Sequence, residues 1–173
     1  MNYEKLNASM LLRLKKKVKM ISAPQTLIIY YSRTGNTASI ARQIAQIIGA
    51  DVFELNTKDA FPKDMSATAD VAIKQYQSGQ LPELVETPTL SSYQRILIGS
   101  PVWNGKLATP IARYLQETQF SQQQVGLFCS SVGQAANVTT KGIKGTTKIL
   151  PTLFLVGSVV TADQVNQWLV KDC

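Results

Sequence analysis

Five short apolar runs alternate with amphipathic stretches along the chain. Each run is rich in β-branched and aromatic residues, which is typical of strands buried in a parallel sheet. Strands alternating with helices predict an α/β fold, a doubly wound parallel sheet with helices on both faces. The predicted strands are Thr26–Tyr31, Asp51–Leu55, Arg95–Trp103, Gln124–Ser131 and Thr152–Val160.

The intervening stretches carry the spacing of helices. In the first of them, Ile40, Ile44 and Ile48 recur on one stripe, and Gly49 follows as a left-handed stop residue. Pro110 suits the first turn of a later helix. The predicted helices are Asn36–Ile48, Ser66–Gln77, Thr109–Thr118 and Thr161–Val170, and the weakly patterned segment Ala135–Leu150 is also predicted to be helical.

Composition limits the chemistry that the chain can perform. Its 173 residues, 45% hydrophobic and 17% charged, indicate one globular domain, and no apolar run reaches the ~18–20 residues needed to span a bilayer. The two cysteines form no CxxC pair, so a reduced, cytoplasmic setting is expected. The absence of histidine excludes Ser–His–Asp and Cys–His nucleophiles and most transition-metal sites. We therefore expect no catalytic side chain and no metal, with a cofactor supplying any chemistry.

The net charge of +7 is concentrated in a basic leader, residues 1–24, which precedes the predicted domain at residues 25–173. The domain itself has a net charge of only +2 and no basic stripe, which argues against a nucleic-acid partner. Leucine, methionine and valine recur every four residues in the leader, so membrane contact through a basic amphipathic helix is one alternative. We favour a disordered tail, or a translation start placed too early with Met20 as the true beginning.

Three predicted strands end in small polar residues, at Ser32–Thr37, Ser100–Gly105 and Ser130–Gly133. The carboxyl ends of parallel strands meet at one edge of the sheet, where ligands bind in such folds. Ser32–Thr37 also opens a helix, whose free N–H groups favour an anion, so the sequence predicts a phosphate site there. A phosphatase-type loop would need arginine where Ala135 stands, so we interpret Cys129 as a core residue.

The motifs SRTGNT, GSPVWNG and CSSVG, in this order on five predicted strands, resemble the flavodoxin family over Thr26–Lys171. The stretch AFPKDMSATADVAIKQYQSGQLPEL is similar to the second-helix region of one branch of that family. The resemblance implies a flavodoxin-like three-layer sandwich with a five-stranded parallel sheet of order 2-1-3-4-5. It also implies a non-covalently bound FMN.

The resemblance further implies which residues bind the cofactor. The first loop would hold the FMN phosphate, the second would line the isoalloxazine ring with Trp103 against it, and the third would flank the other side of the ring. Arg33 could reach the phosphate as an extra cation or point to solvent. The cofactor-binding residues so implied are Ser32, Arg33, Thr34, Gly35, Asn36, Thr37, Pro101, Val102, Trp103, Asn104, Gly105, Ser130, Ser131, Val132 and Gly133.

The chain departs from the family pattern at two positions. Lys106 stands near the ring loop where many relatives carry acidic residues. A nearby positive charge favours the negatively charged reduced cofactor, so we expect a less negative reduction potential. Val132 stands where many relatives stack a tyrosine, which would leave the outer face of the ring more exposed.

These features leave three functions open. The leading one is an electron carrier that shuttles electrons between redox partner proteins through FMN. The alternative is an FMN-dependent NAD(P)H:quinone or small-substrate oxidoreductase. The third is an FMN-binding module with a regulatory or membrane-associated role that depends on the basic leader.

Overall fold

The computed structural model describes residues 25–133, 138, 140, 142–145 and 148–170. The leader, residues 1–24, lies outside this part of the chain, and the interpretations given for it stay predictions. None of the helices in the described residues is long and apolar enough to cross a membrane.

Four parallel strands form the centre of the sheet. They are β2 (Asp51–Glu54), β1 (Thr26–Tyr30), β3 (Arg95–Trp103) and β5 (Gln124–Ser131), and they lie in that order. A short strand, β4 (Lys106–Leu107), folds back on the end of β3 as an antiparallel hairpin. The α/β class and the order of the predicted strands are confirmed, although the described residues form a sheet of seven strands where five were expected.

The fifth position of the sheet is shared by two short strands. β6 (Lys148–Ile149) pairs with the start of β5, and β7 (Leu153–Val156) pairs with its end. Pro151 lies between them and has no N–H to continue the ladder of hydrogen bonds. The predicted strand Thr152–Val160 is therefore too long, because the left-handed Gly157 (φ 84°) turns the chain after Val156.

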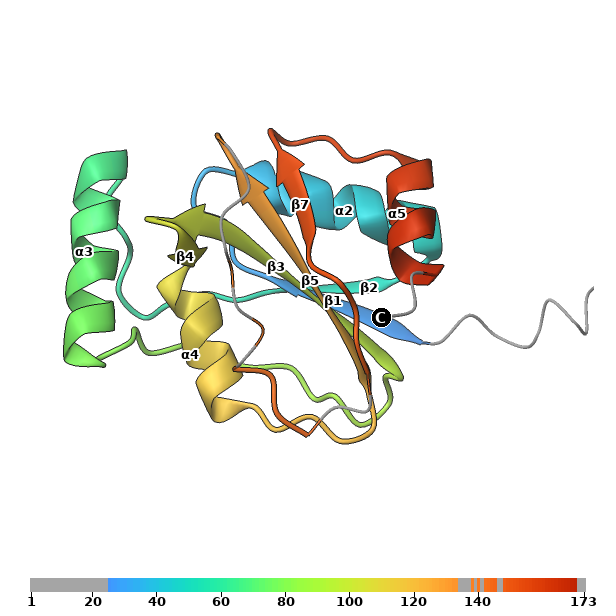
Figure 1. Cartoon of the computed structure of the whole chain (residues 1–173). Coiled ribbons are helices and arrows are strands. Elements are labelled where there is room, and N and C mark those ends of the chain that lie inside the picture. The colour runs from blue at the N-terminus through green and yellow to red at the C-terminus, as the bar shows by residue number, and fades with distance from the viewer. Residues whose placement is uncertain (1–24, 134–137, 139, 141, 146–147, 171–173) are drawn as a thin grey trace, which may run out of the picture.

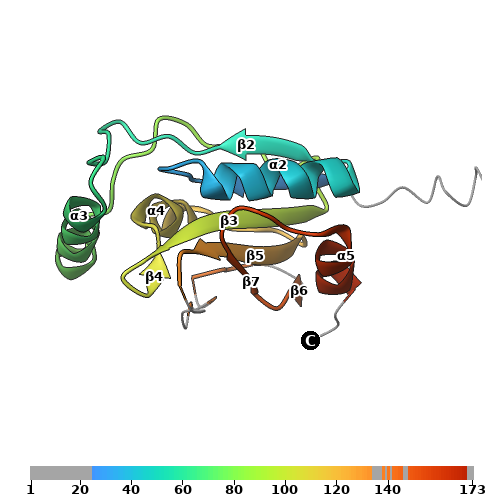
Figure 2. The same ribbon diagram turned by 90° about the horizontal axis from the view of Figure 1, so that it is seen from above.

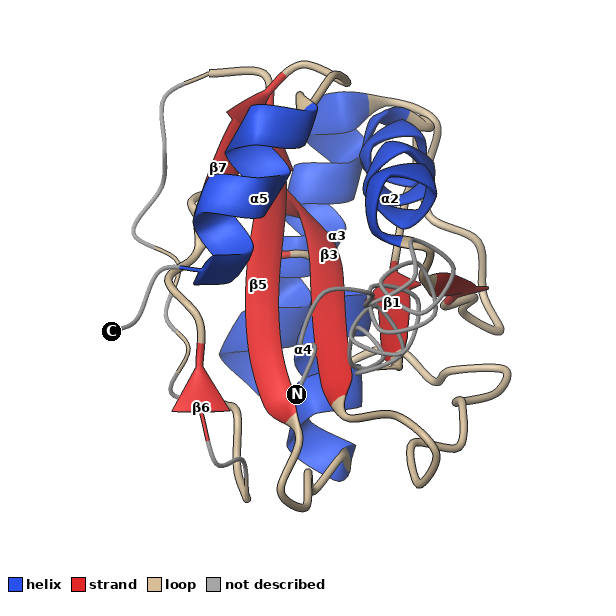
Figure 3. Ribbon diagram, turned by 90° about the vertical axis from the view of Figure 1, so that its right-hand side faces the viewer, coloured by secondary structure: helices blue, strands red, loops and turns tan. Residues whose placement is uncertain are grey.

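Helices lie on both faces of the sheet (Figures 1 and 3). α2 (Asn36–Ile48) and α5 (Ala162–Val170) lie on one face, and α4 (Thr109–Glu117) and α3 (Met65–Ser78) lie on the other. Side chains alternate along β1 accordingly: Ile28 packs in the cluster under α2 and α5, and Ile29 packs in the cluster under α4. The three-layer sandwich is thus confirmed, and the predicted bounds of these four helices agree with the observed ones to within one residue.

The segment Ala135–Leu150 was predicted to be helical, and this prediction is wrong for its described residues. They contain no helix, and Lys148–Ile149 is a strand. The backbone here bonds to other elements: Phe120 donates its N–H to the carbonyl of Lys144 (3.0 Å), and Leu150 donates to that of Val125 (2.8 Å). Tertiary hydrogen bonds replace the helical ones because two glycines disfavour the helix.

α3 stands at the periphery of the molecule, as the view from above shows (Figure 2). Asp64 begins this helix by accepting a hydrogen bond from the N–H of Ala67 (2.8 Å). Only Thr68 and Ala72 are buried in it, whereas α2 buries five of its side chains. Few side chains of α3 are therefore buried against the rest of the domain, and these few include a wall of the site described next.

Candidate functional site

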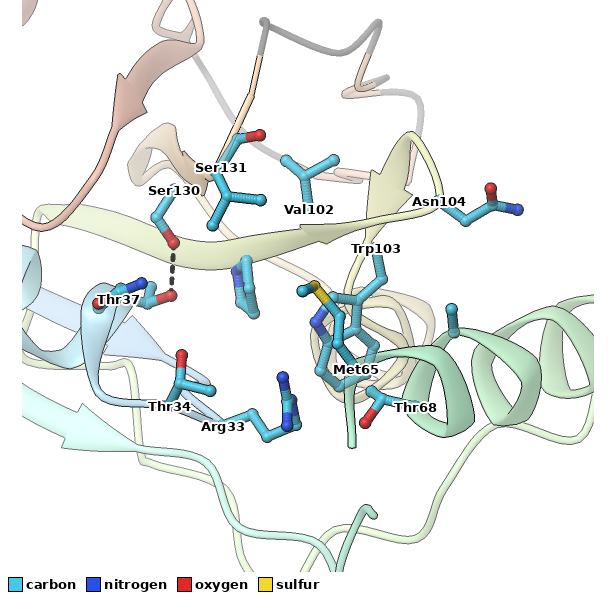
Figure 4. Close-up of a pocket in the computed structure, with 14 residues that line it drawn as sticks. Arg33, Thr34, Thr37, Met65, Thr68, Val102, Trp103, Asn104, Ser130 and Ser131 are labelled. Atoms are coloured by element: carbon cyan, nitrogen blue, oxygen red, sulfur yellow. Dashed lines mark hydrogen bonds between the residues drawn. The ribbon is translucent and has the colours of Figure 1, made fainter. Parts of the chain in front are cut away.

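A cavity of about 300 Å³ lies at the carboxyl edge of the sheet. Four elements enclose it: the start of α2, the first two turns of α3, the end of β3 and the end of β5 (Figure 4). Its lining residues are Arg33, Thr34, Asn36, Thr37, Met65, Thr68, Ala69, Pro101, Val102, Trp103, Asn104, Ser130, Ser131 and Val132. The three polar loops that the sequence predicted to converge do so around this cavity.

One side of the cavity, which we call the donor end, consists of Ser32–Thr37 together with Ser130. Gly35 has φ 91°, a left-handed conformation that glycine adopts at little cost, and it precedes the first turn of α2. The first intrahelical bond is donated by Ser39 to the carbonyl of Gly35 (2.8 Å), so the N–H groups of the preceding turn lack intrahelical acceptors. The first turn carries no acidic residue. The donor end therefore favours an anion.

Two buried hydroxyls join the first and third loops at the donor end. Thr37 Oγ1 and Ser130 Oγ lie 2.7 Å apart, and either atom can donate the hydrogen bond (Figure 4). Thr37 is 1% exposed and Ser130 is 5% exposed. Because each residue is the other's partner, the bond holds the two loops in a fixed relation before any ligand arrives.

Arg33 links the donor end to the segment before α3. Its Nη1 donates hydrogen bonds to the carbonyl oxygens of Pro62 (3.4 Å) and Lys63. The side chain also lines the cavity, between Thr34 and Thr68 (Figure 4). The sequence left two roles open for Arg33, contact with a phosphate and exposure to solvent. This geometry disfavours exposure to solvent. The guanidinium keeps further N–H donors for an anion in the cavity.

The opposite side of the cavity, which we call the aromatic end, consists of Trp103 and Asn104 with Met65 and Thr68 of α3. Trp103 packs at 4.9 Å, centroid to centroid, against the ring of Phe61 and edge-on at 5.7 Å against Tyr31. Burial raises the pKa of Tyr31 to about 12, so its phenol is neutral at pH 7. Trp103 is therefore both a cavity wall and part of a core aromatic cluster, and these neighbours fix its orientation.

The β3–β4 hairpin turns at Asn104 and Gly105, both in the left-handed region with φ 48° and 74°. Asparagine tolerates this conformation better than most residues. Lys106 does not line the cavity: its ammonium lies 4.7 Å from the centroid of the Tyr76 ring. Its charge is thus held on the side of the hairpin that faces α3.

All but four of the predicted cofactor-binding residues line the cavity; the exceptions are Ser32, Gly35, Gly105 and Gly133. Ser32 Oγ instead accepts a hydrogen bond from the N–H of Gly35 (3.1 Å), and Ser131 Oγ accepts one from Gly133 (3.1 Å). These residues shape the loops that carry the lining side chains.

Met65, Thr68 and Ala69 line the cavity but were not predicted as site residues. Their spacing places them on one face of α3, a signal present in the sequence. That face could be recognised as a wall only by knowing that α3 docks beside Trp103. Thr68 is held there by its hydroxyl, which is within hydrogen-bonding distance of the carbonyls of Pro62 (2.9 Å) and Asp64 (2.8 Å).

Among the described residues that line the cavity, Arg33 is the only one with an ionisable side chain. Cys129 is fully buried, and burial raises the pKa of its thiol to about 12, so it stays protonated at neutral pH. The described lining therefore holds no side chain suited to general acid–base or nucleophilic catalysis.

The sheet order and the cavity at its carboxyl edge define a doubly wound α/β protein whose donor end favours an anion. Residues 25–172 match the model of the family described as Flavodoxin, and the chain belongs to the flavodoxin family. The predicted family membership is thereby confirmed.

Solved structures agree with this assignment. The chain is similar to a flavoprotein from Lactobacillus acidophilus NCFM in complex with FMN, with 28% identity, a TM-score of 0.69, and coverage of 85% of this chain and 99% of that one. Structures from Bacteroides eggerthii DSM 20697 (15% identity, TM-score 0.67, 85% and 96% covered) and Bacteroides uniformis ATCC 8492 (21%, 0.65, 87% and 100% covered) share the fold.

Proposed function

We propose that the chain binds FMN non-covalently in this cavity and carries electrons between redox partner proteins. The observation that carries the proposal is the polarity of the cavity, with anion-favouring groups at the donor end and a half-buried tryptophan at the aromatic end. FMN has the same polarity, a phosphate at one end and a flat ring at the other. The Lactobacillus relative, which is similar over nearly its whole length, was solved with FMN bound.

The residues of the donor end fit a phosphate dianion. Thr34, Thr37 and Arg33 offer donors from side chains, and the opening turn of α2 offers donors from the backbone. No carboxylate lines the described cavity to repel the ligand. We expect these groups to supply most of the affinity, because hydrogen bonds to charged groups are stronger than those to neutral groups.

The aromatic end would bind the ring and control its access to solvent. When bound, FMN supplies the electron-transfer chemistry. The protein's part is to hold the ring, exclude water from one side of it with Trp103, and leave an accessible edge. Val132 is 79% exposed and Met65 is 63% exposed, so the mouth of the cavity is open beside apolar side chains. An electron carrier requires such an accessible edge.

The first test is the visible spectrum of the full-length chain purified without added cofactor, followed by titration of the FMN-free chain with FMN and with riboflavin. We expect a yellow protein and an affinity for FMN at least about a hundredfold above that for riboflavin, since only FMN engages the donor end. A colourless chain that cannot be loaded with FMN would refute the proposal.

The carrier and the oxidoreductase are separated by a second experiment, an anaerobic reductive titration combined with a turnover assay. Two resolved one-electron steps and negligible NAD(P)H oxidation in the presence of a quinone support the carrier. Rapid NAD(P)H oxidation with a single two-electron step supports the alternative. The lack of an acid–base side chain in the described lining favours the carrier.

The identity of the redox partners, a cytoplasmic location and the membrane role of the leader stay predictions. The domain is nearly neutral, with a net charge of +2 over residues 25–173. We therefore expect association with partners to depend only weakly on salt concentration, in contrast to strongly charged pairs.

A further inference from the structure

A second cavity, of about 500 Å³, lies beside β4 and α4. Its walls come from α4, from β4, from Tyr76 of α3 and from described residues between 138 and 144. Figure 1 shows β4 directly beside α4, with α3 next to them. The two cavities have no described lining residue in common, so we treat them as separate sites.

The inner wall of the second cavity is apolar and firmly held. Leu107 is 7% exposed and Leu115 is 3% exposed, and Ala112 completes this wall. The hydroxyl of Tyr76 donates a hydrogen bond to the carbonyl of Leu107 (2.7 Å), and burial raises the pKa of this phenol to about 12, so it stays neutral. The wall therefore suits a flat or aliphatic apolar group.

The outer wall, which consists of the described residues between 138 and 144, is anchored to the core. Ile143 is 8% exposed within the core cluster, and Lys144 accepts the N–H of Phe120 through its carbonyl (3.0 Å). A Cβ built on Gly142 would lie 3.7 Å from Cβ of Leu115, which is ordinary van der Waals contact. The outer wall thus packs directly on α4.

The charged side chains among the described lining residues of the second cavity are both positive. Lys106 and Lys144 line it and are exposed, and no carboxylate is among its described lining residues. The nearest carboxylate along α4, that of Glu117, is paired with Arg113 at 2.5 Å and does not neutralise the lysines. An apolar hollow with two ammonium groups is complementary to an anion that has an apolar body.

We propose that the second cavity binds a small organic anion composed of an apolar ring or chain and one carboxylate. The apolar body would lie against Leu107, Ala112 and Leu115, and the carboxylate would lie between Lys106 and Lys144. A volume of about 500 Å³ is within the range of small-molecule sites. This inference goes beyond the FMN site and does not rest on it.

The probe we choose is 2-naphthoate, with 2-naphthamide as its uncharged counterpart. Isothermal titration calorimetry on the full-length, FMN-saturated chain is expected to give saturable 1:1 binding of naphthoate and binding of the amide at least about fivefold weaker. Saturation with FMN keeps the probe out of the first cavity. The amide signals of Gly142 and Gly105 in a two-dimensional NMR spectrum are expected to shift on titration, and that of Gly49 at the far end of α2 is not.

Two variants test the position and the chemistry of the site. Ala112→Trp fills the hollow and is expected to weaken naphthoate binding by at least about tenfold. The double change Lys106→Gln with Lys144→Gln preserves the hollow and is expected to weaken it about five- to tenfold, while leaving binding of the amide unchanged. Lys74→Gln, an exposed lysine on α3 outside the cavity, is the matched control and is expected to change nothing.

Absence of saturable binding, equal affinity for acid and amide, or equal loss in the Lys74 control would each overturn the proposal. If Ala112→Trp fails to fold, the double lysine variant decides alone. If the chain takes up no FMN, the proposed function fails, and the same titration of the FMN-free chain still decides this inference. The two failures are therefore distinguishable.

Discussion

The donor end of the first cavity rests on elements buried in the sheet, whereas the aromatic end depends on a hairpin and on peripheral α3. α2 continues from the donor end with Ile40, Ala41 and Ile44, all 0% exposed, and Ser130 belongs to the buried strand β5. α3 buries only Thr68 and Ala72. The first part of the site is held by the core, and the second is held by a few specific contacts.

The two ends of the cavity are therefore suited to different tasks, binding a phosphate and adjusting the surroundings of a ring. A phosphate needs donors at fixed positions, because hydrogen bonds lose strength steeply with distance and angle. A ring whose redox properties are to be adjusted needs a wall that can vary without unfolding the sheet. We therefore expect substitutions at the donor end to affect affinity most, and substitutions at the aromatic end to affect the ring's surroundings.

The largest effect is expected for Thr37→Val. The change removes a donor from the donor end and leaves the buried Ser130 hydroxyl without its partner. We expect FMN binding to weaken about 10- to 100-fold and the free energy of unfolding to fall by about 1–3 kcal/mol. Fluorescence titration with FMN and urea unfolding measure the two quantities. Thr37→Ser keeps the hydroxyl and should restore both; unchanged FMN affinity in the valine variant would show that the donor end does not bind the phosphate.

A smaller effect is expected for Phe61→Leu, which removes the ring packed on Trp103 and Tyr31. Each aromatic pair contributes about 0.5–1.5 kcal/mol, so we expect a loss of stability of about 1–2 kcal/mol. A less firmly held Trp103 should weaken FMN binding about three- to tenfold and alter the near-ultraviolet circular dichroism. Phe53→Leu, in β2 and half-buried, is the control: it should lower stability without changing FMN affinity. Equal FMN affinities for the two variants would show that Phe61 does not support FMN binding.

Thr68→Val tests whether α3 is a true wall of the site. The change removes the hydroxyl near the carbonyls of Pro62 and Asp64 but keeps the shape of the side chain. We expect a loss of stability of about 0.5–1.5 kcal/mol and a loss of FMN affinity of no more than about threefold. Thr68→Ser should behave as the unmodified chain. A loss as large as that of Thr37→Val would contradict the contrast between the two ends.

The smallest effect is expected for Lys106→Glu, measured as the reduction potential of bound FMN. Reversing this charge disfavours the negatively charged reduced cofactor, so the potential should become more negative. The ammonium is exposed and lies over Tyr76, outside the cavity lining, so the shift should be only about 10–40 mV. Lys74→Glu makes the same change elsewhere on the surface and should shift the potential less. An unchanged potential in the Lys106 variant would refute the expectation drawn from the sequence.

The apolar runs and polar loops predicted the sheet order and the convergence of the three loops, because both follow from local patterns and from the rule that parallel strands end at one edge. The segment Ala135–Leu150 was predicted wrongly, since its described backbone bonds to distant elements. The sequence did not predict that two short strands, β6 and β7, share the last position of the sheet. Pro151 interrupts the hydrogen bonds to β5, and this effect depends on which strand lies beside it.

The sequence by itself determined where the donor end lies: a strand, a hydroxyl-rich turn and a helix start are consecutive in the chain, and their chemistry is local. Only the tertiary structure decided that Thr37 meets Ser130, that Arg33 reaches Pro62 and Lys63, and that Met65 and Thr68 form a wall. It also decided that Lys106 rests on Tyr76 beside a second cavity. The elements that meet in these contacts lie far apart in the chain, so no local period or motif in the sequence shows which of them pack together.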